Sequence, residues 1–199
     1  MAWYCHYLSN FNAAPFNWTV IILFGFELAY ITFQASKGQS SHFNFDTPLY
    51  AILYSLMGLA AVIVTLYTAY IGFLFFTQFF PNLPIHYIWA IRLGILIFVV
   101  FSFEGALMSS NMSHSVGAIN DNSNLWIIGW SKTVGDLRFS HFIGMHALQL
   151  LPLLSVYIFK DTKMTIVISL LYAVLATTTL VQALNGKPIF TQNEQKKVE

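Results

Sequence analysis

The sequence predicts an all-α integral membrane protein, a bundle of five spanning helices with an interfacial N-terminal segment and one long ordered loop. Hydrophobic residues make up 57% of the 199 positions and charged residues only 9%, against roughly 25% charged residues in soluble domains. The mean hydropathy is +0.64. No stretch alternates polar and apolar residues between regular turn signals, which disfavours a transmembrane β-barrel.

The same composition excludes several classes of protein. Nine Lys and Arg residues oppose eight Asp and Glu residues, a net charge of +1, so the charge balance implies no nucleic-acid partner. Cys5 is the single cysteine, which rules out an internal disulfide and a multi-thiolate metal site. The expected surroundings are therefore membrane lipids, and no other partner follows from composition.

Each predicted span is an apolar stretch near the ~20 residues that a membrane-crossing helix needs. The stretches cover residues 18–36, 49–76, 87–109, 140–159 and 164–184, within one membrane domain of residues 1–190 that is followed by a solvated tail, 191–199. The first ends at Lys37-Gly38, and Asp46-Thr47-Pro48 opens the second with helix-start residues.

The remaining boundaries are marked by helix-breaking or polar residues. Pro81 and Pro84 separate the second and third spans, because neither can continue a helix. Residues 111–139 form the one long loop, and 160–163 form a minimal hairpin before the last span. Within the fourth span, Pro152 has no N–H and leaves the carbonyl of Leu148 without its helical donor.

Residues 1–17 mix Trp3, Tyr4 and Phe16 with serine, asparagine and histidine and contain no basic cluster. This composition is not that of a cleavable signal peptide. It predicts a segment lying in the headgroup zone, with a frayed terminus as the alternative.

An uneven distribution of basic residues predicts the orientation. The side that carries the long loop and the C-terminus holds more basic residues than the N-terminal side (Lys37, Lys132, Arg138, Lys187, Lys196 and Lys197 against Lys160, Lys163 and the nearby Arg92). Because Lys and Arg concentrate on the cytoplasmic side, we expect the C-terminus inside and the N-terminus outside.

The most informative residues are the ionisable ones inside the spans: Glu27, Arg92, Glu104 and His146. Such a group costs roughly 2.5–3.5 kcal/mol at a helix centre on insertion scales, so each is a functional hypothesis. Arg92 lies near its helix start and can reach the interface. Counted from the helix ends at about 1.5 Å per residue, Glu104 and His146 both lie roughly 9 Å deep on the loop side, and Glu27 lies about 14 Å deep.

We therefore expect a buried His/Glu pocket near one face, roofed by the long loop and binding a transition metal (Zn, Fe or Cu). His146 and Glu104 would be the innermost ligands, with His141, His114 and Glu27 as further ligands or orienting partners. A bis-histidine haem is less favoured, because of the histidines only His146 lies clearly inside a span. The loop also offers Asp121.

Three polar residues are candidates for binding a cofactor or docking the loop. Gln149 lies three residues after His146 and shares its helix face. Asp136 and Arg138 would pair to hold the loop, or the arginine would recognise an anion. The aromatic content, with 19 Phe, 10 Tyr and 5 Trp, is compatible with a lipophilic ligand such as a quinone, but also with ordinary packing.

Two other functional interpretations stay open at this point. Glu27, Glu104 and His146 could form a proton or ion relay in a transport component. Alternatively, Glu104, Arg138 and His146 could satisfy one another and pin the loop onto the bundle of a structural subunit in a larger membrane complex. No residue is identified as catalytic, and neither an enzymatic activity nor the oligomeric state follows from the sequence.

Several motifs resemble those of a group of bacterial multi-pass membrane proteins without an assigned activity. They are Met112-Ser113-His114, Gly129-Trp130-Ser131, Gly135-Asp136-Leu137-Arg138, and the run from His141 to Gln149 with Pro152. The motifs cover the long loop and the fourth span, while the overall similarity extends over most of the spans. The resemblance implies a bacterial inner-membrane location and no particular mechanism.

Overall fold

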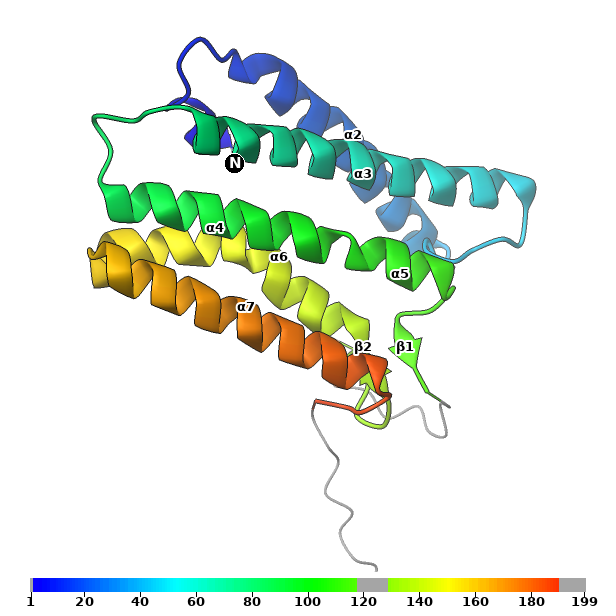
Figure 1. The fold of residues 1–199 in the computed structure, drawn as a ribbon. Coiled ribbons are helices and arrows are strands. Elements are labelled where there is room, and N and C mark those ends of the chain that lie inside the picture. Colours follow the sequence, from blue (N-terminus) through cyan, green and yellow to red (C-terminus); the bar gives the residue numbers. More distant parts are fainter. Residues whose placement is uncertain (1, 118–128, 190–199) are drawn as a thin grey trace, which may run out of the picture.

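The structure is a computed structural model that describes residues 2–117 and 129–189, and it contains the five expected spans (Figure 1). The long helices are α2 (Ala13–Ser36), α3 (Pro48–Thr77), α4 (Ile85–Ser102), α6 (Leu137–Leu154) and α7 (Thr162–Leu184). Helix α5 (Glu104–Ser110) extends the third span, and the π-helix η1 (Ser155–Phe159) extends the fourth. The all-α membrane fold is confirmed. The expected tail, 191–199, lies outside the described residues.

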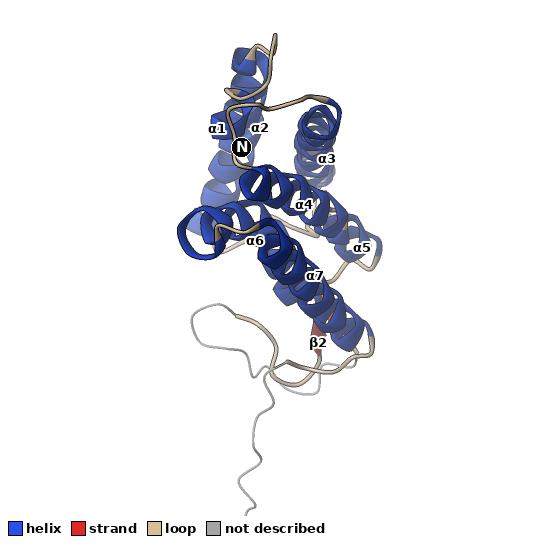
Figure 2. Ribbon diagram, turned by 60° about the vertical axis from the view of Figure 1, so that its left-hand side comes forward, coloured by secondary structure: helices blue, strands red, loops and turns tan. Residues whose placement is uncertain are grey.

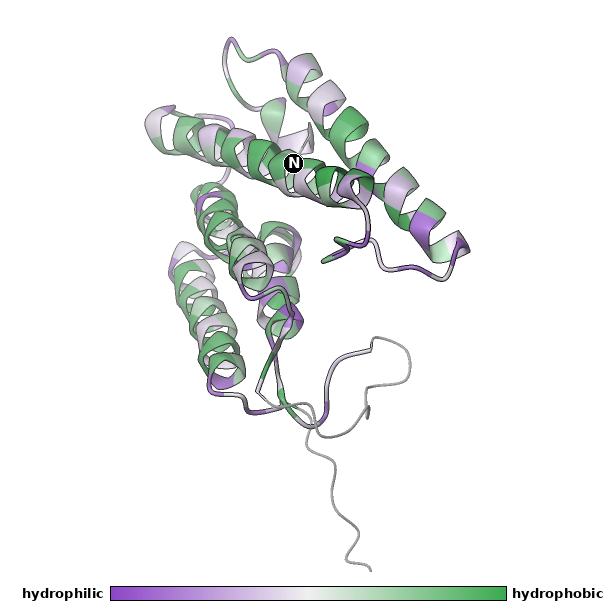
Figure 3. Ribbon diagram, turned by 90° about the vertical axis from the view of Figure 1, so that its right-hand side faces the viewer, coloured by the Kyte–Doolittle hydropathy of each residue, from purple (hydrophilic) through white to green (hydrophobic). Residues whose placement is uncertain are grey.

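Short elements complete the fold at the two ends of the bundle. Helix α1 (Ala2–Cys5) precedes α2, and strands β1 (Ser115–Val116) and β2 (Gly135–Asp136) form an antiparallel ribbon beside the end of α7. Hydrophobic residues run along every long helix, whereas hydrophilic residues concentrate at the helix ends and in the connections (Figure 3).

Local sequence explains where the helices start. The side chains of Asn12, Thr47, Asp136 and Asp161 accept hydrogen bonds from backbone N–H groups in the first turns of α2, α3, α6 and α7. These caps satisfy donors that have no partner inside a helix. Pro48 follows Thr47 as the first residue of α3, where a missing N–H costs nothing.

Three of the long helices form a central group, and the other two pack outside it. Helices α4, α6 and α7 pack against one another, α3 packs on α4, and α2 packs on α3 (Figure 2). Close approach of α4 to α6 depends on glycine, because a Cβ at Gly94 would lie 2.9 Å from the carbonyl oxygen of Ala147. Small residues at helix contacts are a common way of packing membrane helices. The α4–α6 pair therefore forms the rigid centre on which the candidate site is built.

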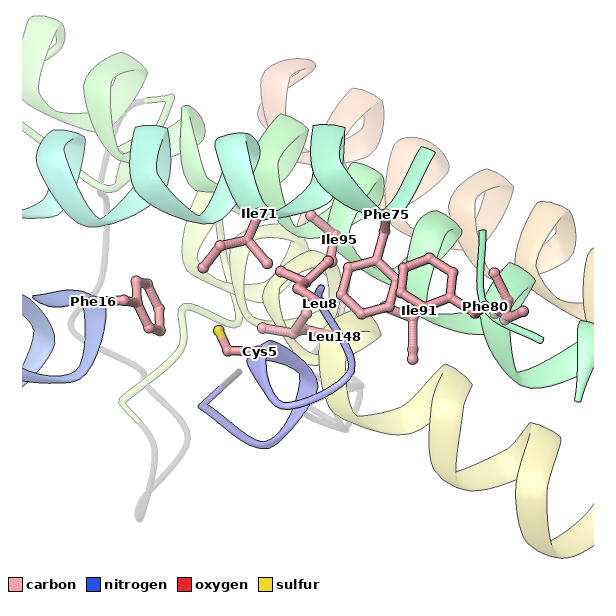
Figure 4. Close-up of a cluster of buried hydrophobic side chains, with 10 residues drawn as sticks. Cys5, Leu8, Phe16, Ile71, Phe75, Phe80, Ile91, Ile95 and Leu148 are labelled. Carbon is pink, nitrogen blue, oxygen red and sulfur yellow. The ribbon is translucent and has the colours of Figure 1, made fainter. Parts of the chain in front are cut away.

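Three clusters of buried side chains lie among the described residues, and the two with most members hold the spans together. The larger joins the N-terminal segment and α2 to α3, α4 and α6 (Cys5, Leu8, Phe16, Ile71, Phe75, Phe80, Ile88, Ile91, Ile95 and Leu148; Figure 4). The smaller joins α4, α6 and α7 through Ile97, Phe101, Ala147, Leu151 and Ala176.

The N-terminal segment is packed against the helices. Cys5 is 1% exposed and Leu8 is 5% exposed, and the Tyr4 hydroxyl donates a 3.0 Å hydrogen bond to the carbonyl oxygen of Leu148. This is the carbonyl that Pro152 deprives of its helical donor. Burial, with a smaller contribution from Tyr7, raises the pKa of Tyr4 to about 12, so this hydroxyl keeps its proton at neutral pH. The alternative of a frayed terminus does not apply to residues 3–9.

This contact predicts the effect of a single-atom deletion. Replacing Tyr4 by phenylalanine is expected to lower the free energy of unfolding by about 1–2 kcal/mol, because the Leu148 carbonyl is then left without a donor. Unfolding of the purified protein in mixed micelles, followed by circular dichroism, measures the difference. Tyr157→Phe is the matched control, because Tyr157 is 75% exposed. Equal loss in both variants would contradict the role of the Tyr4 hydroxyl.

Candidate functional site

The end of the long loop is held to the start of α6 by an ion pair. Arg138 donates from Nε to Asp136 Oδ1 at 3.0 Å and from an amino group to Asp136 Oδ2 at 2.6 Å, and the same amino group donates to the Gly129 carbonyl. The Ser131 amide also donates to Oδ2 at 3.0 Å. The expected Asp136–Arg138 pair thus forms, and it connects loop residues 129–131 to the first turn of α6.

Asp136 is 4% exposed and also caps α6 by accepting from the Arg138 amide. Burial alone would raise the pKa of its carboxyl. The hydrogen bonds from Arg138 and Ser131, together with the positive charge of Arg138, outweigh burial and hold the pKa below its ordinary value. The carboxylate is therefore charged at neutral pH, and the arginine is engaged with it.

His114 lies next to this ion pair through the backbone. Its carbonyl oxygen accepts from the Leu137 amide at 2.9 Å, directly before β1 pairs with β2. Burial, aided by the positive charge of Arg138 and opposed by Asp136, lowers the pKa of the His114 imidazole. The imidazole is consequently neutral at pH 7.

The lowered pKa predicts how stability depends on pH. Unfolding restores an ordinary imidazole pKa near 6.5, so in mildly acidic solution the unfolded chain binds more protons than the folded one. The free energy of unfolding should therefore fall as the pH decreases through about 6.5. Denaturant titrations across this range measure the slope, and His114→Gln should reduce it. An unchanged slope in that variant would contradict the assignment.

Glu104 occupies a break in the third span. Regular helical bonding is interrupted at Phe103, so α4 ends at Ser102 and α5 begins at Glu104. The carboxyl group is buried, with the residue 5% exposed, and its Oε2 lies 3.1 Å from the hydroxyl of Ser140, a residue with no exposed surface. Within the described part of the chain, Oε1 has no hydrogen-bond partner.

His141 contacts the same break from α6. Its Nδ1 lies 2.8 Å from the carbonyl oxygen of Phe101. Because a carbonyl can only accept, Nδ1 carries the hydrogen and the Nε2 lone pair is unused by this bond. The ring also lies against Gly105, with Cε1 3.9 Å from the position of a Cβ there. We call Glu104, Ser140, His141 and the Phe101 carbonyl the Glu104 site.

The structure does not bring His146 into the Glu104 site. Glu104 lies beside Ser140, so His146, six residues further along α6, is about 9 Å deeper in the bundle and on a different side of the helix. Its side chain is exposed, with Nδ1 2.7 Å from the carbonyl oxygen of Phe142. The expectation that both residues lie at one depth was wrong, because the ends of the two spans are not level.

Two other predicted residues also lie away from Glu104. Gln149 is exposed one turn beyond His146. Glu27 is half-buried on α2, a helix whose extensive contacts are with α3 and not with α5 or α6. The other acid of the long loop, Asp121, lies outside the described residues.

A metal site of the expected composition is not assembled. In residues 2–117 and 129–189, no group of three or more His, Cys, Asp or Glu side chains lies close enough together to hold a metal ion. The predicted ligands instead divide among the ion-pair region (His114), the Glu104 site (Glu104 and His141), an outward face (His146) and a separate helix (Glu27).

Sequence reasoning missed the hydroxyl groups. The Ser140 hydroxyl contacts Glu104, although an isolated serine near a helix end gives no pattern that singles it out, whereas Ser131 contacts Asp136 through its backbone N–H. At the opposite end of the bundle, His86 Nδ1 lies 2.9 Å from Ser155 Oγ, which lies 3.0 Å from Thr165 Oγ1. This second polar cluster lies at the start of the π-helix η1. In this region the sequence predicted only the loss of one helical hydrogen bond at Pro152.

No protein-family model, no curated protein and no solved structure matches the chain. The functional argument therefore depends on the geometry of the Glu104 site and its surroundings.

Proposed function

We propose that this multi-pass membrane protein is a proton-handling component of a membrane transport process, with Glu104 as the group that takes up and releases the proton. The observation that carries the proposal is the buried Glu104 carboxyl at a break in a spanning helix, with Oε1 unpartnered in the described chain. Ionisable groups inside spans and interrupted membrane helices are both typical of ion pathways.

The Ser140 hydroxyl supports this role because it can match either charge state of Glu104. Its oxygen lies 3.1 Å from Glu104 Oε2 and 3.1 Å from the carbonyl oxygen of Leu137, but it has only one hydrogen. When Glu104 is ionised, that hydrogen can be donated to Oε2. When Oε2 carries a proton, the carboxyl can donate to Ser140, and Ser140 can donate to Leu137. Both states are thus hydrogen-bonded without a change in backbone structure.

A proton is also what the environment of Glu104 favours. A carboxylate removed from water needs a positive partner or a proton to offset its lost hydration. The basic side chain at this end of α6, Arg138, is already paired with Asp136. Neutralising Glu104 by a proton requires no additional side chain, whereas an ion pair would require one.

Two measurements on reconstituted protein test the proposal. In proteoliposomes with a trapped pH indicator and an imposed proton gradient, we expect proton flux with the natural chain and its loss in Glu104→Gln. Glu27→Gln is the matched control, because it removes the other intramembrane carboxyl, on a different helix, and should retain the flux. An absence of flux dependent on Glu104, in folded protein of normal helical content, would refute the proposal.

A transition metal is the second candidate, and the tautomer of His141 favours it. Metal-bound histidines usually donate their other N–H to a carbonyl or carboxylate, as His141 does to Phe101. Zn, Fe or Cu held by Glu104 and His141 would need further ligands, because no third His, Cys, Asp or Glu of the described residues completes a metal site with them. Elemental analysis of the natural protein, Glu104→Gln and His141→Ala decides this. If the natural protein contains stoichiometric metal and both variants lose it, the Glu104 site binds a metal ion and the proton-handling role is withdrawn.

We also propose a bacterial inner-membrane location with the C-terminus in the cytoplasm. Lys37, Lys132 and Lys187 support this orientation, but Arg138 contributes less than its charge suggests because it is paired with Asp136. Reporter fusions at the two ends of the chain test the orientation, and an external C-terminus would reverse it.

A further inference from the structure

The outward face of α6 presents two polar side chains near the middle of its span. His146 and Gln149 are exposed, and they lie about 14 and 18 Å along the helix from Leu137. The span continues to Phe159, so neither residue is close to an end. Polar groups that face lipid at this depth are unfavourable unless something pairs with them. This face, with Phe142 and Leu153, is here called the His146 face.

Hydrogen-bond directions define what the two side chains can offer. Nδ1 of His146 lies 2.7 Å from the Phe142 carbonyl oxygen, so it carries the hydrogen, and neutral His146 presents the Nε2 lone pair outward. The amide of Gln149, oriented so that its nitrogen serves as the donor, places that nitrogen 3.3 Å from the carbonyl oxygens of Met145 and His146. Its Oε1 is then free to accept. Both groups are acceptors, and acyl chains supply no donors.

Aromatic rings flank the two acceptors on the loop side. The Phe142 ring lies 4.0 Å from the His146 imidazole, between centroids, at an interplanar angle of 35°. Trp130 packs edge-on against Phe142 at 5.8 Å and against Phe139 at 4.9 Å. Phe142 is 49% exposed and Leu153 is 54% exposed. The face therefore combines flat apolar surface with two acceptors.

We propose that the His146 face binds a lipid-soluble hydroquinone. Such a molecule is a flat aromatic ring with two hydroxyl donors, which match the acceptors His146 Nε2 and Gln149 Oε1. Its ring can pack on Phe142, and its tail can lie among acyl chains. A second copy of α6 fits less well, because it would bring the same two acceptors to the interface. This site is independent of the proton-handling role of Glu104.

The donor requirement makes the proposal testable with a series of related ligands. The probes are trimethylhydroquinone, its oxidised quinone and its dimethyl ether, which share a ring but differ in hydroxyl donors. Calorimetry on detergent-solubilised protein, with the hydroquinone kept reduced, measures affinity. We expect the hydroquinone to bind at least roughly tenfold more tightly than either of the other two, the usual effect of one buried hydrogen bond.

Matched variants locate the site. His146→Phe keeps a flat ring beside Phe142 but removes the acceptor, and Gln149→Leu removes the other; each should weaken hydroquinone binding roughly tenfold. Thr177→Val is the control, because it removes an exposed hydroxyl from the C-terminal half of α7. Equal affinity for all three probes, or unchanged binding in both variants, would overturn the proposal. So would a dimer in sedimentation that these variants dissociate, since a second copy would then occupy the face.

Discussion

Replacing Gly144 by alanine is expected to lower the free energy of unfolding by about 3 kcal/mol, the upper part of the range for overpacking a well-packed core. Gly144 lies in α6 against α4, and a Cβ there would overlap Cβ and Cγ of Phe101. These atoms lie next to the backbone, so the side chain cannot swing aside as the tip of a long chain could. The two central helices must therefore separate to admit one methyl group.

A second glycine variant isolates this steric effect from the general effect of alanine on helices. Gly58→Ala in α3 adds the same methyl group where no atom lies within 4 Å of the new Cβ. It should leave stability unchanged or raise it by roughly 0.5–1 kcal/mol, because alanine is the better helix former. Unfolding in mixed micelles, followed by circular dichroism, compares the two. Equal stability of both variants would show that α4 and α6 can separate freely.

The ends of the spans could be predicted because they depend on local chemistry. Pro48 is the first residue of α3, Pro84 directly precedes α4, and Asp161 caps the helix that follows it. The apolar stretches that are long enough to span a bilayer then give the number of times that the chain crosses the membrane. The Asp136–Arg138 pair was equally local, because the two residues are neighbours around a helix start.

The depth of the site residues could not be predicted from local chemistry. Counting residues inward from each helix end assumes that all ends lie level, but Glu104 is beside Ser140 and not beside His146. The offset arises from packing across α4 and α6, where Gly94 and Gly144 set the register of the contact. The register depends on side chains of both helices, so the sequence of either span alone does not determine it.

The break at Phe103 also had no sequence signal. Phe103 is neither proline nor glycine, and its neighbours Ser102, Glu104 and Gly105 did not predict an interruption of the helix. The interruption is recognised only through its tertiary partner, because the His141 imidazole bonds to the Phe101 carbonyl at 2.8 Å. The hydrogen bond between Tyr4 and Leu148 could not be predicted for the same reason, because most of the chain separates the two residues in sequence.

Replacing Arg138 by methionine is expected to cost about 2–3 kcal/mol of folding stability. Removing one partner of a buried ion pair leaves the other charge unpaired, which costs roughly 3–5 kcal/mol when both groups are fully buried. Here the Asp136 side chain is 5% exposed and that of Arg138 is 33% exposed, so solvent reduces the loss. The Gly129 carbonyl also loses its donor, and the loop should detach from α6.

A double variant separates the unpaired charge from the lost packing. Asp136→Asn combined with Arg138→Met has no buried charge, so it should be more stable than Arg138→Met alone, a coupling that independent sites do not show. Lys163→Met, which removes an exposed cation at the start of α7, is the control and should change stability by less than about 0.5 kcal/mol. Trypsin cleavage after Lys132 reports the loop itself. If the loop is held by the ion pair, cleavage accelerates in Arg138→Met; equal cleavage rates would mean that residues 129–135 are held by other contacts.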